Sequence, residues 1–103
     1  MNNLNPRLFC KDGFSISVQG NRHAYCTPRL DDATYTHVEC GFPSSDPITK
    51  ELIDYAENPE DLCETVYGFV PVDVVINELN AHGGLVGDTQ TPKLSNNVKL
   101  IAE

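Results

Sequence analysis

Basic residues are missing from a large part of this sequence. Residues 51–92 hold nine acids and no lysine or arginine, whereas residues 1–50 hold five acids and five bases. The full chain has a formal net charge of −8. Such an excess of negative charge repels phosphate groups and anionic lipids and attracts cationic surfaces. The sequence therefore argues against direct binding to nucleic acid or to a membrane, and in favour of a basic protein partner.

Long apolar runs are absent as well. A membrane-spanning helix needs about 20 consecutive apolar residues, and no stretch of this chain approaches that length. The first residues, "MNNLNPRLF", lack the basic flank and the apolar centre of a signal peptide. We therefore expect a cytoplasmic protein whose four cysteines are reduced.

Motifs for hydrolysis, phosphate binding and dinucleotide binding are missing. The stretches "HAYC" and "HVEC" share the spacing His-x-x-Cys, so four zinc ligands could formally come from His23, Cys26, His37 and Cys40. Each pair lies in a predicted strand, however, where an offset of three places the two side chains on opposite faces. Cysteine also packs as a small hydrophobic residue. We therefore expect core cysteines, no metal and no cofactor.

The residues that are present predict one α+β domain. The chain has 103 residues, of which 40% are hydrophobic, and at this length about two-thirds of the surface can be buried on folding. "FSISVQGNRHAYCT" alternates like a hairpin with its turn at Gly20-Asn21, and "TYTHVECGF" alternates like a further strand. We predict a two-layer sandwich, an antiparallel sheet of four to five strands with two helices on one face. The domain is expected to span residues 1–84, and residues 85–103 to form an extended C-terminal tail.

Two segments carry helix signals. The first helix is predicted with Asp46 as N-cap and Pro47 at its first position, and it should end before Pro59. The second is predicted to end at Gly83-Gly84. Its apolar stripe consists of Val72, Val75, Ile76 and Leu79.

The densest negative charge lies in "ELIDYAENPEDLCET", residues 51–65, which contain six acids. On a helix, acids one turn apart lie about 5–6 Å from each other, a spacing that can imitate a short track of phosphates. Such a row fits a groove of lysine and arginine built for nucleic acid. The acids predicted to contact a partner are Glu51, Asp54, Glu57, Glu60, Asp61, Glu64, Asp73 and Glu78. The candidate apolar anchors beside them are Tyr55, Leu62, Tyr67 and Phe69.

The stretches "HAYCTPR", "VECGFP" and "TVYGFVP" resemble pieces of an uncharacterised phage protein family. The small size, the strong acidity and the lack of a catalytic motif give the whole chain a resemblance of class. It resembles the small acidic proteins that bacteriophages encode, including anti-CRISPR proteins and other host-takeover inhibitors. The resemblance implies a non-enzymatic inhibitor in the host cytoplasm. Its implied partner is the positively charged nucleic-acid channel of a host defence or transcription complex.

Three other interpretations stay open at this point. The charge could be a solvated surface that keeps the protein soluble. The chain could be a structural or adaptor phage protein whose charge is incidental. It could also be a small enzyme that uses a carboxylate with His23, His37 or His82.

Overall fold

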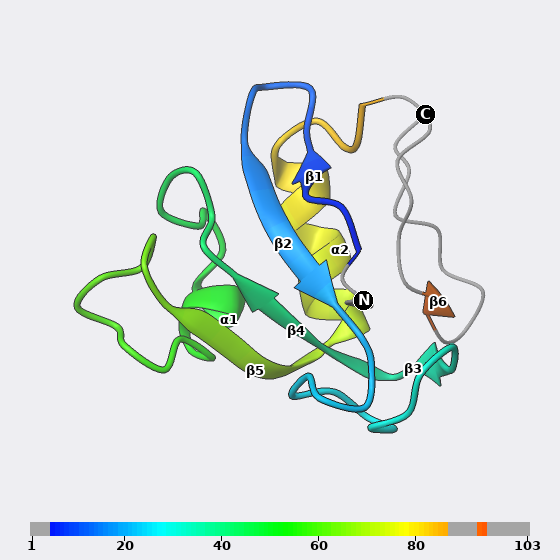
Figure 1. The fold of residues 1–103 in the computed structure, drawn as a ribbon. Helices are drawn as coiled ribbons and strands as arrows, with labels where there is room; N and C mark the ends of the chain where they lie inside the picture. Colours follow the sequence, from blue (N-terminus) through cyan, green and yellow to red (C-terminus); the bar gives the residue numbers. More distant parts are fainter. Residues whose placement is uncertain (1–4, 87–92, 95–103) are drawn as a thin grey trace.

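The computed structural model describes residues 5–86 and 93–94, and its centre is a four-stranded antiparallel sheet (Figure 1). The strand order is β1-β2-β4-β5. These strands are β1 (Leu8–Phe9), β2 (Ser15–Gln19), β4 (His37–Gly41) and β5 (Val66–Pro71). Two short strands, β3 (Thr34–Tyr35) and β6 (Lys93–Leu94), form a separate parallel pair.

Two helices, α1 (Lys50–Ile53) and α2 (Val72–Ala81), cover one face of this sheet, which confirms the predicted α+β sandwich (Figure 1). Within residues 5–86 and 93–94, neither helix is long and apolar enough to cross a membrane. α2 ends as predicted, because Gly83 and Gly84 adopt positive φ angles of 86° and 84°. The backbone N–H of Gly84 donates to the carbonyl of Leu79 at 2.9 Å, which closes the last turn.

The core lies between the sheet and α2. In β2, Ile16 and Val18 are buried, and in β4 Val38 and Cys40 are buried. The apolar positions of the predicted period-two alternation are therefore buried, but Ser15 and Gln19 on the other face of β2, predicted to face solvent, are buried as well. From α2, the predicted stripe contributes buried Val72, Val75 and Leu79, and Ile76 packs against the cluster.

The predicted hairpin after Phe14 is wrong. β2 pairs with β1 and with β4, and no strand returns along it from residues 22–27. The reason is the side chain of Asn21, whose Oδ1 accepts the backbone N–H groups of His23 and Ala24 at 2.7 and 2.8 Å. An Asn side chain that binds its own following backbone in this way stabilises a turn. The chain then crosses to β3 and β4.

The domain extends past the predicted boundary at Gly84. Leu85, assigned by that boundary to the tail, is buried in the core and forms an isolated bridge with Cys10. The backbone N–H of Val86 donates to the carbonyl of Phe9 at 2.9 Å. Residues 87–92 and 95–103, which include the predicted last strand "VKLIA", lie outside the described residues.

Candidate functional site

The first helix is much shorter than the sequence predicts. α1 comprises only Lys50–Ile53, and its N-cap is Thr49 rather than Asp46. The reason is the carboxylate of Glu78, which accepts hydrogen bonds from the backbone N–H groups of Ile48 and Thr49 at 2.8 and 2.9 Å. Because a side chain of α2 takes these backbone donors, the chain enters the helix later than predicted.

Most of the acidic segment, which we define as residues 51–64, lies outside helix. Asp54 is the C-cap of α1, and the backbone N–H of Glu57 donates to a carbonyl of β5 at 3.0 Å. From there to Glu64 the chain follows a series of bends and turns. A continuous helical row of Glu51, Asp54 and Glu57 is therefore a wrong prediction, because pairing with β5 requires extended backbone at Glu57.

The acids of this segment nevertheless face solvent. Exposed side chains are found at Glu51, Asp54, Glu57, Glu60, Asp61 and Glu64, and also at Asp73 in the first turn of α2. Asp54 pairs with Lys50, with Nζ and Oδ1 3.1 Å apart. Across residues 5–86, no other acid of the segment forms an ion pair with lysine or arginine. The segment therefore presents carboxylates that the described part of the chain leaves largely without counterions.

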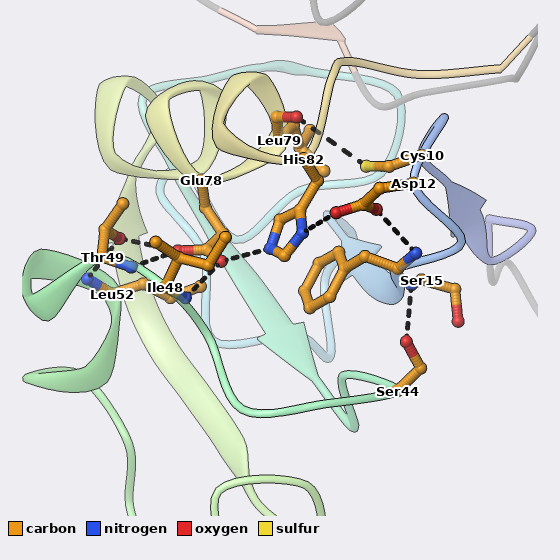
Figure 2. Close-up of polar contacts among 11 residues, drawn as sticks. Cys10, Asp12, Ser15, Ser44, Ile48, Thr49, Leu52, Glu78, Leu79 and His82 are labelled. Atoms are coloured by element: carbon orange, nitrogen blue, oxygen red, sulfur yellow. Dashed lines mark hydrogen bonds and ion pairs between the residues drawn. The ribbon is translucent and has the colours of Figure 1, made fainter.

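Glu78 is the exception among the predicted contact residues. Its side chain is 1% exposed, so it cannot reach a partner. Figure 2 shows it pointing from α2 toward the start of α1. Oε1 accepts the backbone N–H and the hydroxyl of Thr49 at 2.9 and 2.7 Å, and Oε2 accepts the backbone N–H of Ile48. The buried carboxylate of Glu78 therefore caps the N-terminal end of α1. The apolar stripe of α2 in the sequence does not indicate this role.

His82 lies between two carboxylates. Its Nε2 is 2.7 Å from Oε2 of Glu78, and its Nδ1 is 2.7 Å from Oδ2 of Asp12 (Figure 2). The ring stacks on Phe14 with centroids 3.7 Å apart and an interplanar angle of 5°. His82 is 4% exposed, whereas 47% of the Asp12 side chain is exposed. We call Asp12, His82 and Glu78 the His82 network.

The hydrogen bonds of the His82 network fit an imidazolium between two ionised carboxylates. A neutral imidazole has one N–H donor and one lone pair, whereas the protonated ring donates from both nitrogens. The backbone N–H of Phe14 and the ring of His82 lower the pKa of Asp12. Burial raises the pKa of Glu78, but the hydrogen bonds at the start of α1 and from His82 outweigh it and hold that pKa below its usual value. Both carboxylates therefore favour their charged form.

This network contains no activated nucleophile. Cys10 is close by, with its thiol 3.9 Å from the carbonyl oxygen of Leu79. Burial, followed by the charges of Asp12 and Glu78, raises the pKa of Cys10 to about 11, so the thiol stays protonated at neutral pH. Both nitrogens of His82 are held by carboxylates and neither faces a thiol. The arrangement joins the turn after β1, the start of α1 and the end of α2, as a structural clamp does.

The positions of the other cysteines and histidines can be compared with the prediction that the strand cysteines pack in the core. Cys26 and Cys40 are buried, as predicted, while His23 is exposed. The thiol of Cys63 has a raised pKa because of partial burial and then a hydrogen bond to Asp46. Within residues 5–86 and 93–94, no three His, Cys, Asp or Glu side chains are placed to hold a metal ion.

Two exposed aromatic side chains lie beside the acidic segment. Tyr25 is 39% exposed and Phe69 is 45% exposed, and their rings stack with centroids 5.8 Å apart. We call them the aromatic pair. Of the predicted anchors, Tyr67 is fully buried and serves the core, whereas Phe69 and Tyr55 reach solvent. Tyr25 was not among the anchors predicted from the sequence, because its neighbour Phe69 lies far away along the chain.

Phe69 occupies a β-bulge. The register of β4 and β5 shifts between Val38 and Cys40, so that Glu39 alone faces both Gly68 and Phe69. At Phe69 φ is +52°, in the left-handed region. A residue other than glycine costs about 1–2 kcal/mol there. The surrounding contacts therefore hold an exposed aromatic ring in a backbone conformation that it does not prefer.

Comparison with known proteins identifies no relative: no protein-family model, curated protein or solved structure matches the chain.

Proposed function

We propose that this chain is a non-enzymatic acidic inhibitor, of the kind that anti-CRISPR proteins represent. Its acidic segment, with Asp73, binds a basic surface that a host protein complex uses for nucleic acid. The observation that carries the proposal is the exposure of Glu51, Glu57, Glu60, Asp61 and Glu64 without a lysine or arginine partner among residues 5–86.

Because most of the acidic segment is a loop, its carboxylates do not form the regular row that a helix would give. Carboxylates on bends, turns and a helix end do not repeat at the even pitch of a nucleic-acid strand. They form a negative surface whose field steers a cationic partner and raises the rate of encounter. The interaction is expected to weaken with salt, because exposed charges are screened over about 8 Å at physiological ionic strength.

Affinity purification from a bacterial lysate, read by mass spectrometry, tests the proposal. The immobilised protein is expected to capture a nucleic-acid-binding complex at low ionic strength, to lose it at high ionic strength, and to lose it to added duplex DNA. Duplex DNA competes because it occupies the same basic surface.

Two double variants locate the surface. Glu60→Lys/Glu64→Lys reverses two charges of the acidic segment, and Asp31→Lys/Asp32→Lys makes the same net change on the loop before β3. The first is expected to weaken binding of the captured complex by about fivefold or more, since each exposed ion pair contributes roughly 0.2–1 kcal/mol. The second should bind nearly as wild type. Capture that both variants retain, or that neither salt nor DNA reduces, would contradict the proposal. Circular dichroism confirms that each variant is folded.

A further inference from the structure

We infer that the aromatic pair and the carboxylate of Glu57 form a receptor for an arginine side chain of the partner. The inference rests on the proposed function, since it assumes a basic partner, and it names the chemistry by which that partner is held. Charge alone gives attraction without a fixed orientation. An aromatic face next to a carboxylate adds a place where one planar cation binds.

The aromatic pair is held in place by backbone hydrogen bonds. The N–H of Tyr25 donates to Oε1 of Glu39 at 2.8 Å, and the carbonyl of Tyr25 accepts the N–H of Phe69 at 2.9 Å. Tyr25 is thereby held between Glu39 of β4 and the bulge of β5. Its ring and that of Phe69 are inclined by 23°. Side chains that are ordered before binding lose little conformational entropy on binding.

A carboxylate meets the aromatic pair at Gly68. A methyl group on Gly68 would come within 3.3 Å of Oε2 of Glu57 and 3.4 Å of Cβ of Tyr25. The exposed carboxylate of Glu57 and the side chain of Tyr25 therefore both lie against this residue. With no side chain at Gly68, the negative charge and the ring are close enough for one cation to contact both.

The chain already places a guanidinium over this aromatic surface. Cζ of Arg29 lies 5.7 Å from the centroid of the Tyr25 ring, within the range of a cation–π contact. Nη2 of Arg29 also donates to the backbone carbonyl of His23, at 3.4 Å. Arg29 shows which group fits the ring, and it is a competitor for an arginine of the partner.

Arginine suits this surface better than lysine. The guanidinium is planar, stacks on aromatic faces and donates in a fork that matches a carboxylate, whereas the ammonium of lysine is compact and strongly hydrated. Nucleic-acid-binding grooves supply both residues. The aromatic pair is therefore expected to select arginine, while the acidic segment attracts either cation.

Peptides of equal charge separate the attraction by the acidic segment from the selection of arginine by the aromatic pair. A peptide of about nine arginines and one of about nine lysines are titrated against the purified protein by calorimetry at fixed ionic strength. The ratio of their affinities is compared between wild type and two variants, Phe69→Leu in the aromatic pair and Phe9→Leu on β1 at the opposite edge of the sheet. Phe69→Leu is expected to reduce the preference for arginine about two- to fivefold, with little change for lysine. Phe9→Leu should keep the wild-type ratio.

Arg29→Gln is a variant for which we expect the opposite change, a stronger preference for the arginine peptide. Removing the internal guanidinium frees the ring of Tyr25, so affinity for the arginine peptide is expected to rise about two- to fivefold more than affinity for the lysine peptide. Nuclear magnetic resonance adds a measurement on the unaltered chain. The ring protons of Tyr25 and Phe69 should shift with the arginine peptide and shift much less with the lysine peptide.

The outcomes distinguish this inference from the function on which it rests. An unchanged ratio in Phe69→Leu, or ring protons that respond equally to both peptides, overturns the arginine receptor. If Glu60→Lys/Glu64→Lys still weakens both peptides in that case, the acidic surface survives without the receptor. If that double variant binds both peptides as wild type does, the proposed function fails as well.

Discussion

The carboxylate of Glu78 can be replaced by the amide of glutamine with almost no change in shape, which makes Glu78→Gln a direct test of the His82 network. Four hydrogen-bond donors converge on the two carboxylate oxygens: the ring of His82, the backbone of Ile48, and the backbone and hydroxyl of Thr49. An amide offers one oxygen and one NH₂ group. At the position of Oε1 the NH₂ group faces both donors of Thr49. At the position of Oε2 it faces the backbone N–H of Ile48, so in either orientation at least one buried donor loses its acceptor.

The expected loss follows from that geometry. A buried donor left without an acceptor costs about 1–3 kcal/mol, and removing one partner of a buried charge pair costs about 3–5 kcal/mol. We therefore expect Glu78→Gln to lower the free energy of unfolding by about 3–5 kcal/mol at neutral pH. A small domain has only about 5–15 kcal/mol in total. At about 4 °C per kcal/mol, the melting temperature should fall by roughly 12–20 °C.

At acidic pH the difference in the free energy of unfolding between wild type and Glu78→Gln should become smaller. The pKa of Glu78 is lowered in the folded state, so its contribution is complete above the unfolded value of about 4.3 and is lost as pH falls through the folded value. One such proton changes the free energy of unfolding by at most about 1.4 kcal/mol per pH unit. Below about pH 4.3 the wild type should therefore lose stability more steeply than the variant, which lacks this carboxylate.

Urea unfolding followed by circular dichroism at several pH values measures both effects. The matched control is Glu51→Gln, the same substitution at an exposed position, which should stay within about 0.5 kcal/mol of wild type. If Glu78→Gln matches this control at neutral pH, or runs parallel to wild type in acid, the assigned role of the His82 network is wrong.

Three further predictions concern the backbone and the core. Phe42→Gly relieves a φ of +51° at an exposed side chain and should raise the free energy of unfolding by up to about 1 kcal/mol in urea; a clear loss would contradict this. Gly20→Ala should lower it by about 1–3 kcal/mol, because its Cβ would lie 2.6 Å from the ring of buried Tyr35; a melting temperature equal to wild type would refute the close contact. The thiol of Cys10, with a pKa of about 11, should react with a disulfide reagent at neutral pH only after unfolding, and rapid labelling of the native protein would disagree.

Regular periodicity made the strands and the second helix predictable. The alternation in β2 and β4 and the apolar stripe of α2 are local patterns, and glycines with positive φ end that helix. The hairpin after Phe14 and the start of α1 were not predictable in this way. Asn21 folds its own backbone into a turn, and Glu78 takes the donors before α1 from 29 and 30 residues away.

The candidate site was predictable in composition and not in arrangement. Exposed acids followed from the charge of the segment, whereas the burial of Glu78 depends on a partner that only the fold supplies. Its spacing of four residues from His82 on α2 is a signal that a sequence can carry. Asp12, however, is 70 residues from His82, and the contact between Tyr25 and Phe69 requires a bulge that no local pattern marks.

The described acids divide by what they do for the fold. Asp12, Glu39 and Glu78 accept backbone hydrogen bonds and hold separate elements together. No backbone N–H among residues 5–86 donates to the carboxylates of Glu60 or Glu64, and no lysine or arginine there pairs with them. Like charges placed close together destabilise a compact state, so these exposed carboxylates lower stability, although Leu52 of the same segment packs in the core. The strained position of Phe69 adds a second local cost beside the same segment. Both the repulsion among the carboxylates and the strain at Phe69 are explained under the proposed function, in which a cationic partner covers the carboxylates and the aromatic pair together.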